Sequence, residues 1–220
     1  MKHFPMIGKL PVPFSNAWKT RIFSWLLLGG WCLGGATGLR AATYTSQRSG
    51  EWRQELTGTF IVWQAFSYPS TGDVANINLN VSVGGSEAVA ELRLGGGTLS
   101  GDGSIDVSSL FQWSAGALNM GNLVLNGNSF LSFGAASLSG RVVHNYATAT
   151  HDTAAILNLA GVWNNYGAAS YLLASDASIT NTGTFNNYGL LRKTAGSGTS
   201  DIQPTFNNYG GAVEAQSGTL

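Results

Sequence analysis

One short phrase of residues occurs four times in the second half of the chain at a nearly constant spacing. Each complete copy consists of an aromatic residue, two asparagines, a tyrosine and a glycine. The complete copies occupy 163–167, 185–189 and 206–210, and a weaker copy, Val-His-Asn-Tyr-Ala, occupies 143–147. The positions of successive tyrosines differ by 166−146 = 20, 188−166 = 22 and 209−188 = 21. A repeat of this length is one supersecondary unit that stacks on its neighbours, so the sequence predicts a solenoid.

The residues between the copies favour strands and turns. Thr, Ser, Gly, Ala and Asn predominate there with short apolar alternations, as in 155–159, and no segment has the 3.6-residue period of a helix. A leucine-rich repeat would need a helix-compatible half, and a propeller blade would need about 40 residues. At about 3.3 Å per strand residue, one repeat covers roughly 70 Å of path, which suits two or three short strands joined by bends. The predicted fold is all-β: a right-handed, single-stranded parallel β-helix (β-solenoid) with about 20–22 residues per coil.

In such a fold, equivalent residues of successive coils lie above one another, so repeated side chains form ladders. We expect inward asparagines to hydrogen-bond to the asparagine of the next coil, and tyrosine rings to stack for about 0.5–1.5 kcal/mol per pair. We expect the glycine after each tyrosine to adopt the positive φ of a sharp corner. The residues with these structural roles are Asn145, Tyr146, Asn164, Asn165, Tyr166, Gly167, Asn186, Asn187, Tyr188, Gly189, Asn207, Asn208, Tyr209 and Gly210.

The N-terminal segment differs from the rest of the chain. Residues 1–21 carry four basic residues, residues 22–39 are apolar and end in small residues, and no acidic residue precedes Glu51. A basic, then apolar, then small-residue order is typical of a secretory signal peptide, so we predict that 1–42 is one and is cleaved between Ala36 and Ala42. An uncleaved membrane anchor is the alternative, because 22–39 is nearly long enough to span a bilayer.

Two further parts are expected after the signal peptide. Residues 43–76 are rich in aromatic residues and predict an N-terminal cap that shields the first coil, with Trp52, Trp63 and Phe66 in it. An aromatic platform for sugar rings is the alternative role of this cluster. Residues 77–220 predict roughly seven coils. Because 218–220 begin another copy of the Gly-Thr-Leu phrase at 97–99, we expect further coils beyond the end of this sequence.

Charge and cysteine content restrict the partners. If the mature chain begins at Thr43, it has six basic and eleven acidic residues, a net charge of 6 − 11 = −5. Nucleic acid binding needs clustered Lys and Arg, so no nucleic acid partner is expected. The mature chain has no cysteine, so its stability has to come from stacked coils rather than disulfides.

The sequence offers no catalytic constellation. A β-helix that cleaves acidic polysaccharides needs clustered carboxylates, often with Ca²⁺, and a basic residue, whereas the aspartates here are scattered singly. His144 and His151 have no cysteine or carboxylate partners at metal-site spacing, and His144 stands where the better copies have asparagine. Nucleophile elbows, phosphate loops and zinc signatures are absent. We therefore expect no enzyme activity, metal or cofactor in residues 1–220.

Three patterns together resemble the N-terminal parts of large secreted β-helix proteins of bacteria, including autotransporter-like and filamentous-adhesin-like surface proteins. The patterns are Pro-x-x-Gly-Asp-Val-Ala-Asn-Ile at 69–77, Phe-x-Trp-x-x-Gly-x-Leu at 111–118, and the Phe-Asn-Asn-x-Gly repeats. The resemblance covers roughly residues 50–220 and implies export and a cell-surface or extracellular role. It carries over no catalytic residue.

The expected function is that of a non-catalytic, secreted or cell-surface structural or adhesive β-solenoid. Its partners would be polysaccharide or other cell-surface components, with membrane contact only through export or through an anchor beyond Leu220. One alternative is a carbohydrate-active β-helix enzyme, of the lyase or hydrolase type, whose catalytic residues lie beyond residue 220. Another is a fragment of an autotransporter passenger.

Overall fold

The computed structural model of the chain describes residues 41–53, 62–63, 67–140 and 142–220. The chain divides into two compact units, Met1–Leu39 and Arg40–Leu220, and all described residues belong to the second. The predicted signal peptide and Phe66 of the predicted cap lie outside the described residues. The described part consists of strands and loops only, so it includes no helix that could cross a membrane.

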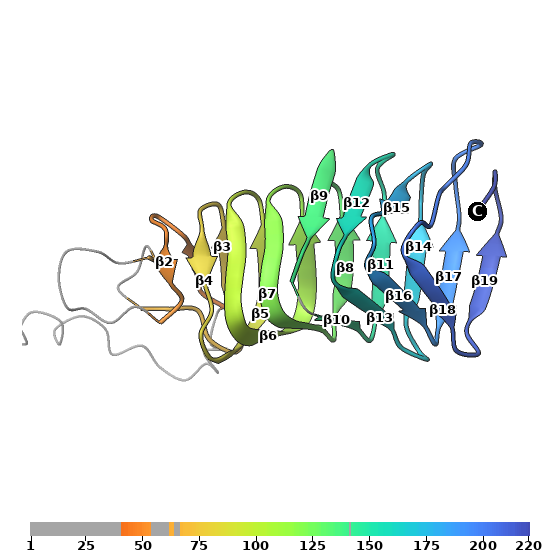
Figure 1. Ribbon diagram of the computed structural model, residues 1–220. Coiled ribbons are helices and arrows are strands. Elements are labelled where there is room, and N and C mark those ends of the chain that lie inside the picture. Colours follow the sequence, from red (N-terminus) through yellow and green to blue (C-terminus); the bar gives the residue numbers. More distant parts are fainter. Residues whose placement is uncertain (1–40, 54–61, 64–66, 141) are drawn as a thin grey trace, which may run out of the picture. The chain divides into compact units, whose positions relative to one another are not determined.

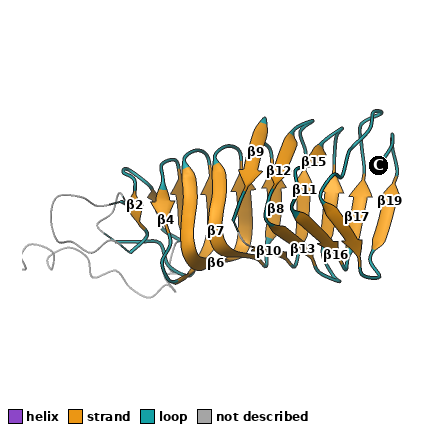
Figure 2. Cartoon of the chain, in the orientation of Figure 1, coloured by secondary structure: helices purple, strands orange, loops and turns teal. Residues whose placement is uncertain are grey.

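The strands form one continuous sheet of parallel pairings, wound into stacked coils (Figures 1 and 2). Their bounds are β1 (Thr43–Thr45), β2 (Gly50–Glu51), β3 (Val74–Ile77), β4 (Val81–Ser82), β5 (Ser86–Leu94), β6 (Thr98–Trp113), β7 (Ala117–Leu125), β8 (Asn128–Leu131), β9 (Ala135–Leu138), β10 (Val142–Asn145), β11 (Thr148–His151), β12 (Ile156–Leu159), β13 (Val162–Asn165), β14 (Ser170–Leu173), β15 (Ser178–Thr180), β16 (Thr184–Asn187), β17 (Leu190–Lys193), β18 (Thr205–Asn208) and β19 (Ala212–Ala215). The predicted all-β parallel solenoid is confirmed.

Each coil passes through three faces of the sheet. Face A contains β1, β3, the end of β5, the end of β6, β8, β11, β14, β17 and β19. Face B contains β2, β4, the start of β6, the start of β7, β9, β12 and β15. Face C contains the start of β5, the middle of β6, the end of β7, β10, β13, β16 and β18, so the solenoid has about seven coils.

From β3 onward the coils lengthen along the chain, whereas the first coil is longer, since Thr43 pairs with Val74, a difference in position of 74−43 = 31. Val74 pairs with Glu91, a difference in position of 91−74 = 17, whereas Val162 pairs with Thr184, a difference of 184−162 = 22. The period predicted from the tyrosines therefore describes the second half of the solenoid and overestimates the coils that run from β3 to β8. The coils from β3 to β8 are shorter because their strands bend directly into one another: β6 alone passes through all three faces in 16 residues.

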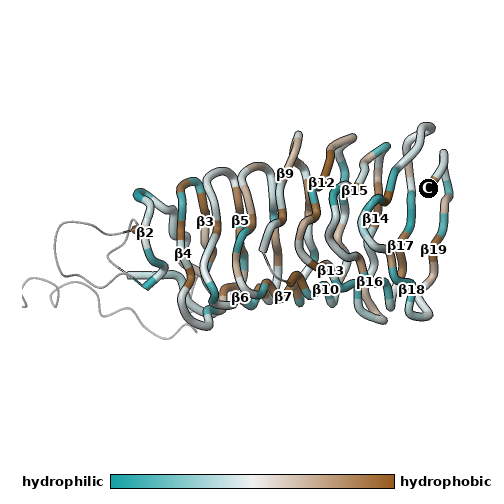
Figure 3. Tube along the Cα trace, viewed as in Figure 1, coloured by the Kyte–Doolittle hydropathy of each residue, from teal (hydrophilic) through white to brown (hydrophobic). Residues whose placement is uncertain are grey.

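Alternation of side chains builds the core. In β13, β14, β16 and β17 the second and fourth residues are buried and the first and third are partly exposed, as a strand with one face toward the core requires. Hydrophobic segments recur from coil to coil along the chain (Figure 3). The buried side chains form one continuous cluster, and each fully buried Leu, Ile or Phe contributes about 1.5–3 kcal/mol.

The predicted cap segment contains strands of the solenoid itself, because β1 pairs in register with β3. Trp52 follows β2, and its ring meets the ring of Trp63 edge-to-face with 4.8 Å between centroids. The indole Nε1 of Trp63 donates a hydrogen bond of 2.9 Å to the carbonyl oxygen of Trp52. Since the two residues are only 1% and 3% exposed, their rings belong to the core and do not offer a platform for sugar.

Candidate functional site

The second asparagine of each repeat lies on the inward side of its strand at the corner between faces C and A; it is buried in the first three copies and exposed in the last. Asn145, Asn165, Asn187 and Asn208 stand in register on β10, β13, β16 and β18. Each of the first three donates from Nδ2 to Oδ1 of the asparagine in the next coil at 2.9 Å. Each also donates to a backbone carbonyl of the following coil, at 3.0–3.3 Å, whereas Oδ1 of Asn145, at the start of the ladder, has no hydrogen-bond partner among the described residues.

The first asparagine of each repeat points outward. Nδ2 of Asn186 donates to Oδ1 of Asn164 at 2.8 Å, and Nδ2 of Asn207 donates to Oδ1 of Asn186 at 2.9 Å. This outer ladder runs in the opposite sense to the inner one, since its amides donate toward the preceding coil. The side chain of His144 stands in register with Asn164, and its Nδ1 lies 3.0 Å from the Tyr166 hydroxyl. Partial burial lowers the pKa of His144, so the imidazole is neutral at pH 7.

The tyrosines of the repeats form an exposed stacked column beside the outer asparagines. The ring centroids of Tyr146 and Tyr166, Tyr166 and Tyr188, and Tyr188 and Tyr209 lie 4.5, 5.7 and 4.9 Å apart, with interplanar angles of 4°, 11° and 19°. Tyr146, Tyr188 and Tyr209 are 46%, 40% and 56% exposed. Stacking covers the ring faces, so the ring edges and hydroxyl groups are what the column offers to a partner.

The glycines after the tyrosines differ from the expectation. Of the three, only Gly210 has a positive φ, of 84°, so the predicted left-handed corner is wrong for Gly167 and Gly189. At Gly189 the constraint is space instead: a Cβ there would lie 2.3 Å from the carbonyl oxygen of Ala169. At Gly167 the nearest atom to a Cβ would be 3.8 Å away, so this position has room for a side chain.

These columns together form one uncharged surface, which we name the Asn–Tyr face. It consists of the outward residues of β10, β13, β16 and β18 and the adjoining tyrosines. Its members are Val142, His144, Tyr146, Val162, Asn164, Tyr166, Thr184, Asn186, Tyr188, Thr205, Asn207 and Tyr209. With His144 neutral, none of them carries a charge, and equivalent residues recur at the strand spacing of about 4.8 Å.

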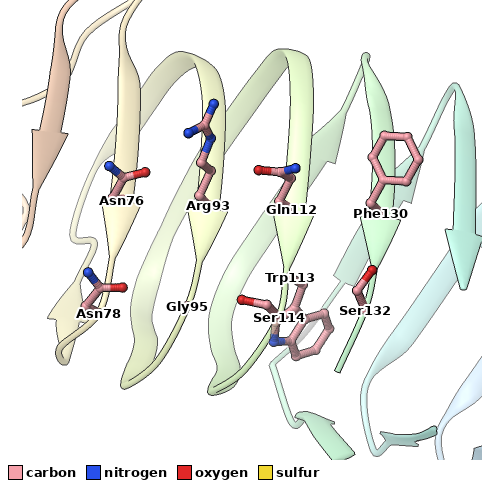
Figure 4. Close-up of a pocket in the computed structure, with 9 residues that line it drawn as sticks. All are labelled: Asn76, Asn78, Arg93, Gly95, Gln112, Trp113, Ser114, Phe130 and Ser132. Carbon is pink, nitrogen blue, oxygen red and sulfur yellow. The ribbon is translucent and has the colours of Figure 1, made fainter. Parts of the chain in front are cut away.

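A groove of about 290 Å³ lies on face A, at the other end of the described solenoid (Figure 4). Asn76, Arg93, Gln112 and Phe130 stand in register on four successive coils and form one row of it. A second row follows at the corner, where the side chains are short; it consists of Asn78, Gly95, Ser114 and Ser132. The sequence analysis missed this groove, because its residues share no repeated type and only the register brings them together.

The chain matches no protein-family model, no curated protein and no solved structure. The fold and the surfaces described above are therefore the whole basis for an inference about function.

Two titratable side chains, His151 and Lys193, are fully buried at positions that the sequence analysis did not assign to the core. His151 is fully buried on β11, with Nδ1 3.2 Å from the hydroxyl of Tyr171, and burial lowers its pKa to about 4. Lys193 is fully buried on β17, and its Nζ donates to Asp176 Oδ1 at 2.7 Å and to Ser200 Oγ at 2.9 Å. The hydrogen bond from Lys193 lowers the pKa of Asp176.

These groups are not arranged for metal binding or catalysis at a shared site. His144 points outward on face C and His151 points inward on face A, so the two histidines are not brought together. Within the described ranges, no three His, Cys, Asp or Glu side chains converge on a position that could hold a metal ion. His151 and Lys193 are enclosed by the core and act on its stability.

Proposed function

We propose that this chain is a non-catalytic, exported β-solenoid with a structural or adhesive role, and that the Asn–Tyr face is its contact surface. The observation that carries the proposal is the regular, charge-free array of amide, hydroxyl and aromatic groups along four successive coils. Exposed aromatic side chains gathered in one patch mark interaction sites in proteins that otherwise bury them.

The repetition itself supports adhesion to an extended partner. A partner with a repeating structure meets equivalent groups on each coil, so several weak contacts act together and raise the overall avidity. A polysaccharide of a cell surface is such a partner, because its hydroxyl groups pair with amides and phenols without needing charge. None of the residues that define the face is a Lys or Arg that could hold phosphate, which argues against nucleic acid.

Binding to insoluble neutral polysaccharides tests the proposal. Retention of the protein on cellulose, chitin and curdlan particles would be compared with retention of Tyr188→Lys, which places a charge in the tyrosine column. The matched control is Ile156→Lys, because Ile156 is exposed to a similar degree, 44% against 40%, but lies on face B. We expect Tyr188→Lys to lower retention roughly tenfold on a polysaccharide that binds the parent protein, and Ile156→Lys to leave it unchanged. Equal retention of both variants, or no retention of the parent protein, contradicts the role of this face.

A further inference from the structure

We propose that the groove on face A is a separate binding site for a short neutral oligosaccharide. It is built by β3, β5, β6 and β8, whereas the Asn–Tyr face is built by the last four strands of face C, so this proposal stands apart from the adhesive role. The groove volume of about 290 Å³ is close to the smallest binding sites for small molecules, about 300 Å³. Four strands in register span about 14 Å along the axis, enough for a few sugar rings in an extended chain.

The polar side chains of the groove match hydroxyl groups. The amides of Asn76, Asn78 and Gln112 each present both a donor and an acceptor, as a sugar hydroxyl does. Asn78 and Gln112 are exposed, and Figure 4 shows the three amides and Arg93 in neighbouring coils along the two rows. The hydroxyl of Ser114, at the corner, adds a further polar group.

Phe130 supplies the apolar part of the site. Its ring is 41% exposed at the end of the row that begins with Asn76, an unusual position for a large aromatic side chain. The C–H face of a sugar ring packs on an aromatic face, while the hydroxyl groups around the sugar remain free to meet the amides. Gly95 has no side chain in the second row, and Oδ1 of Asn78 would lie 2.8 Å from a Cβ there, so the Asn78 amide lies over this glycine.

Charge argues that the ligand is neutral. Arg93 is the one basic residue among the described residues that line the groove, and its guanidinium is already held by Glu91 of the same strand, through Nε at 3.1 Å and through Nη2 at 2.5 Å. The pair has no net charge, so it can donate to a hydroxyl but offers little attraction to a uronate or a phosphate.

Backbone pairing argues against a peptide. A peptide bound in extended form gains most from an unpaired strand edge. β3, β5, β6 and β8 are each paired on both sides along face A, so only side chains are available to a ligand there. A peptide would gain no strand pairing for its own N–H and C=O groups, whereas a sugar chain is recognised through side-chain contacts alone.

Titration of the full chain with oligosaccharides tests the site. The probes are the tetrasaccharides of cellulose, chitin, starch and mannan, with tetragalacturonate as the acidic comparison and an Ala-Ser-Thr peptide as the peptide comparison, measured by ligand-observed NMR and calorimetry. We expect at least one neutral probe to bind, Phe130→Ala to weaken it ~10-fold, and Phe130→Trp to retain it. Gln112→Glu, which turns a donor and acceptor into an acceptor only, should also weaken it.

The control is Leu172→Ala, which changes the same outward column two coils away and should leave the affinity unchanged. Because Phe130 and Gln112 are exposed, these variants keep the core, and the cooperative unfolding of each variant checks this directly. The proposal is overturned if none of the neutral probes binds at a concentration of ~10 mM, because a specific site of this kind would have a dissociation constant below that concentration. Preference for the acidic probe or the peptide, or equal affinity of Phe130→Ala and the parent protein, also overturns it.

Discussion

Acid should destabilise the solenoid through one buried imidazole, that of His151. The residue lies between Leu131 and Leu173 in the same inward column, and its Nε2 has no hydrogen-bond partner within the described part of the chain. The phenyl ring of Phe133 packs against the imidazole of His151, with 5.1 Å between the ring centroids. Protonation would place a charge among these apolar side chains, and in the imidazolium the Nε2–H would have no acceptor. Burial is the main reason that the pKa of His151 falls, and the nearby Asp152 opposes it.

The size of the effect follows from the two pKa values. The folded state holds the pKa at about 4, and the unfolded chain has the ordinary value of 6.5. Below pH 6.5 the unfolded state binds the proton more tightly, so stability is lost as the pH falls from 6.5 toward 4. At pH 4 this single residue should have removed about 3 kcal/mol from the free energy of unfolding.

Two variants separate this effect from other acid-sensitive groups. His151→Leu matches the neighbours in the column but leaves the hydroxyl of Tyr171 unpaired, at a cost of about 1–3 kcal/mol. The double variant His151→Leu/Tyr171→Phe removes both partners and should be close to the parent protein in stability at pH 7. Urea unfolding of the parent and the double variant at pH 7, 6, 5 and 4 gives the difference directly, because all carboxylates are common to both.

The double variant should therefore become more stable than the parent by about 3 kcal/mol at pH 4. Equal loss of stability between pH 7 and pH 4 in both proteins would refute the assignment. So would a double variant that is several kcal/mol less stable at pH 7, since the polar pair would then contribute more than its hydrogen bond.

Two further pairs of variants test other contacts. Asp176→Ala leaves the buried ammonium of Lys193 without its carboxylate, whereas Lys193→Met leaves only a partly exposed carboxylate. Asp176→Ala should therefore lower the free energy of unfolding in urea more than Lys193→Met does. The reverse order would show that the buried lysine does not need the carboxylate charge. Gly189→Ala should lower the free energy of unfolding by about 2 kcal/mol, because the added Cβ meets the Ala169 carbonyl. Gly167→Ala has free space and should change the melting temperature little. Equal melting temperatures of the two variants would contradict the close approach at Gly189.

The repeat phrase explains why the fold was predictable. Tyrosines that recur at a nearly constant spacing predict stacked coils, and the four rings do stack in one column, that of Tyr146, Tyr166, Tyr188 and Tyr209. The two adjacent asparagines have to point to opposite sides of a strand, but the sequence alone does not say which one faces the core. The corner decides this, because only the second asparagine can reach the backbone carbonyls of the next coil.

The short coils from β3 to β8 and the groove that they form could not be predicted, because no repeated residue type marks them. The positions of Asn76, Arg93, Gln112 and Phe130 differ by 93−76 = 17, 112−93 = 19 and 130−112 = 18, and the four share no residue type, so no repeat marks them as neighbours. Their alignment depends on bends within β5, β6 and β7, including a register shift between Gly101 and Ser104. The signal peptide, the handedness and the export of the chain remain predictions.

The opposite sense of the two asparagine ladders has a consequence for length. The inner amides donate forward along the chain and the outer amides donate backward, so their dipoles point in opposite directions along the same corner. The amide dipole that an added coil contributes to the inner ladder is opposed by the amide dipole that the same coil contributes to the outer ladder. Each further copy of this corner would therefore extend two ladders of opposite sense rather than one ladder whose dipoles all point the same way.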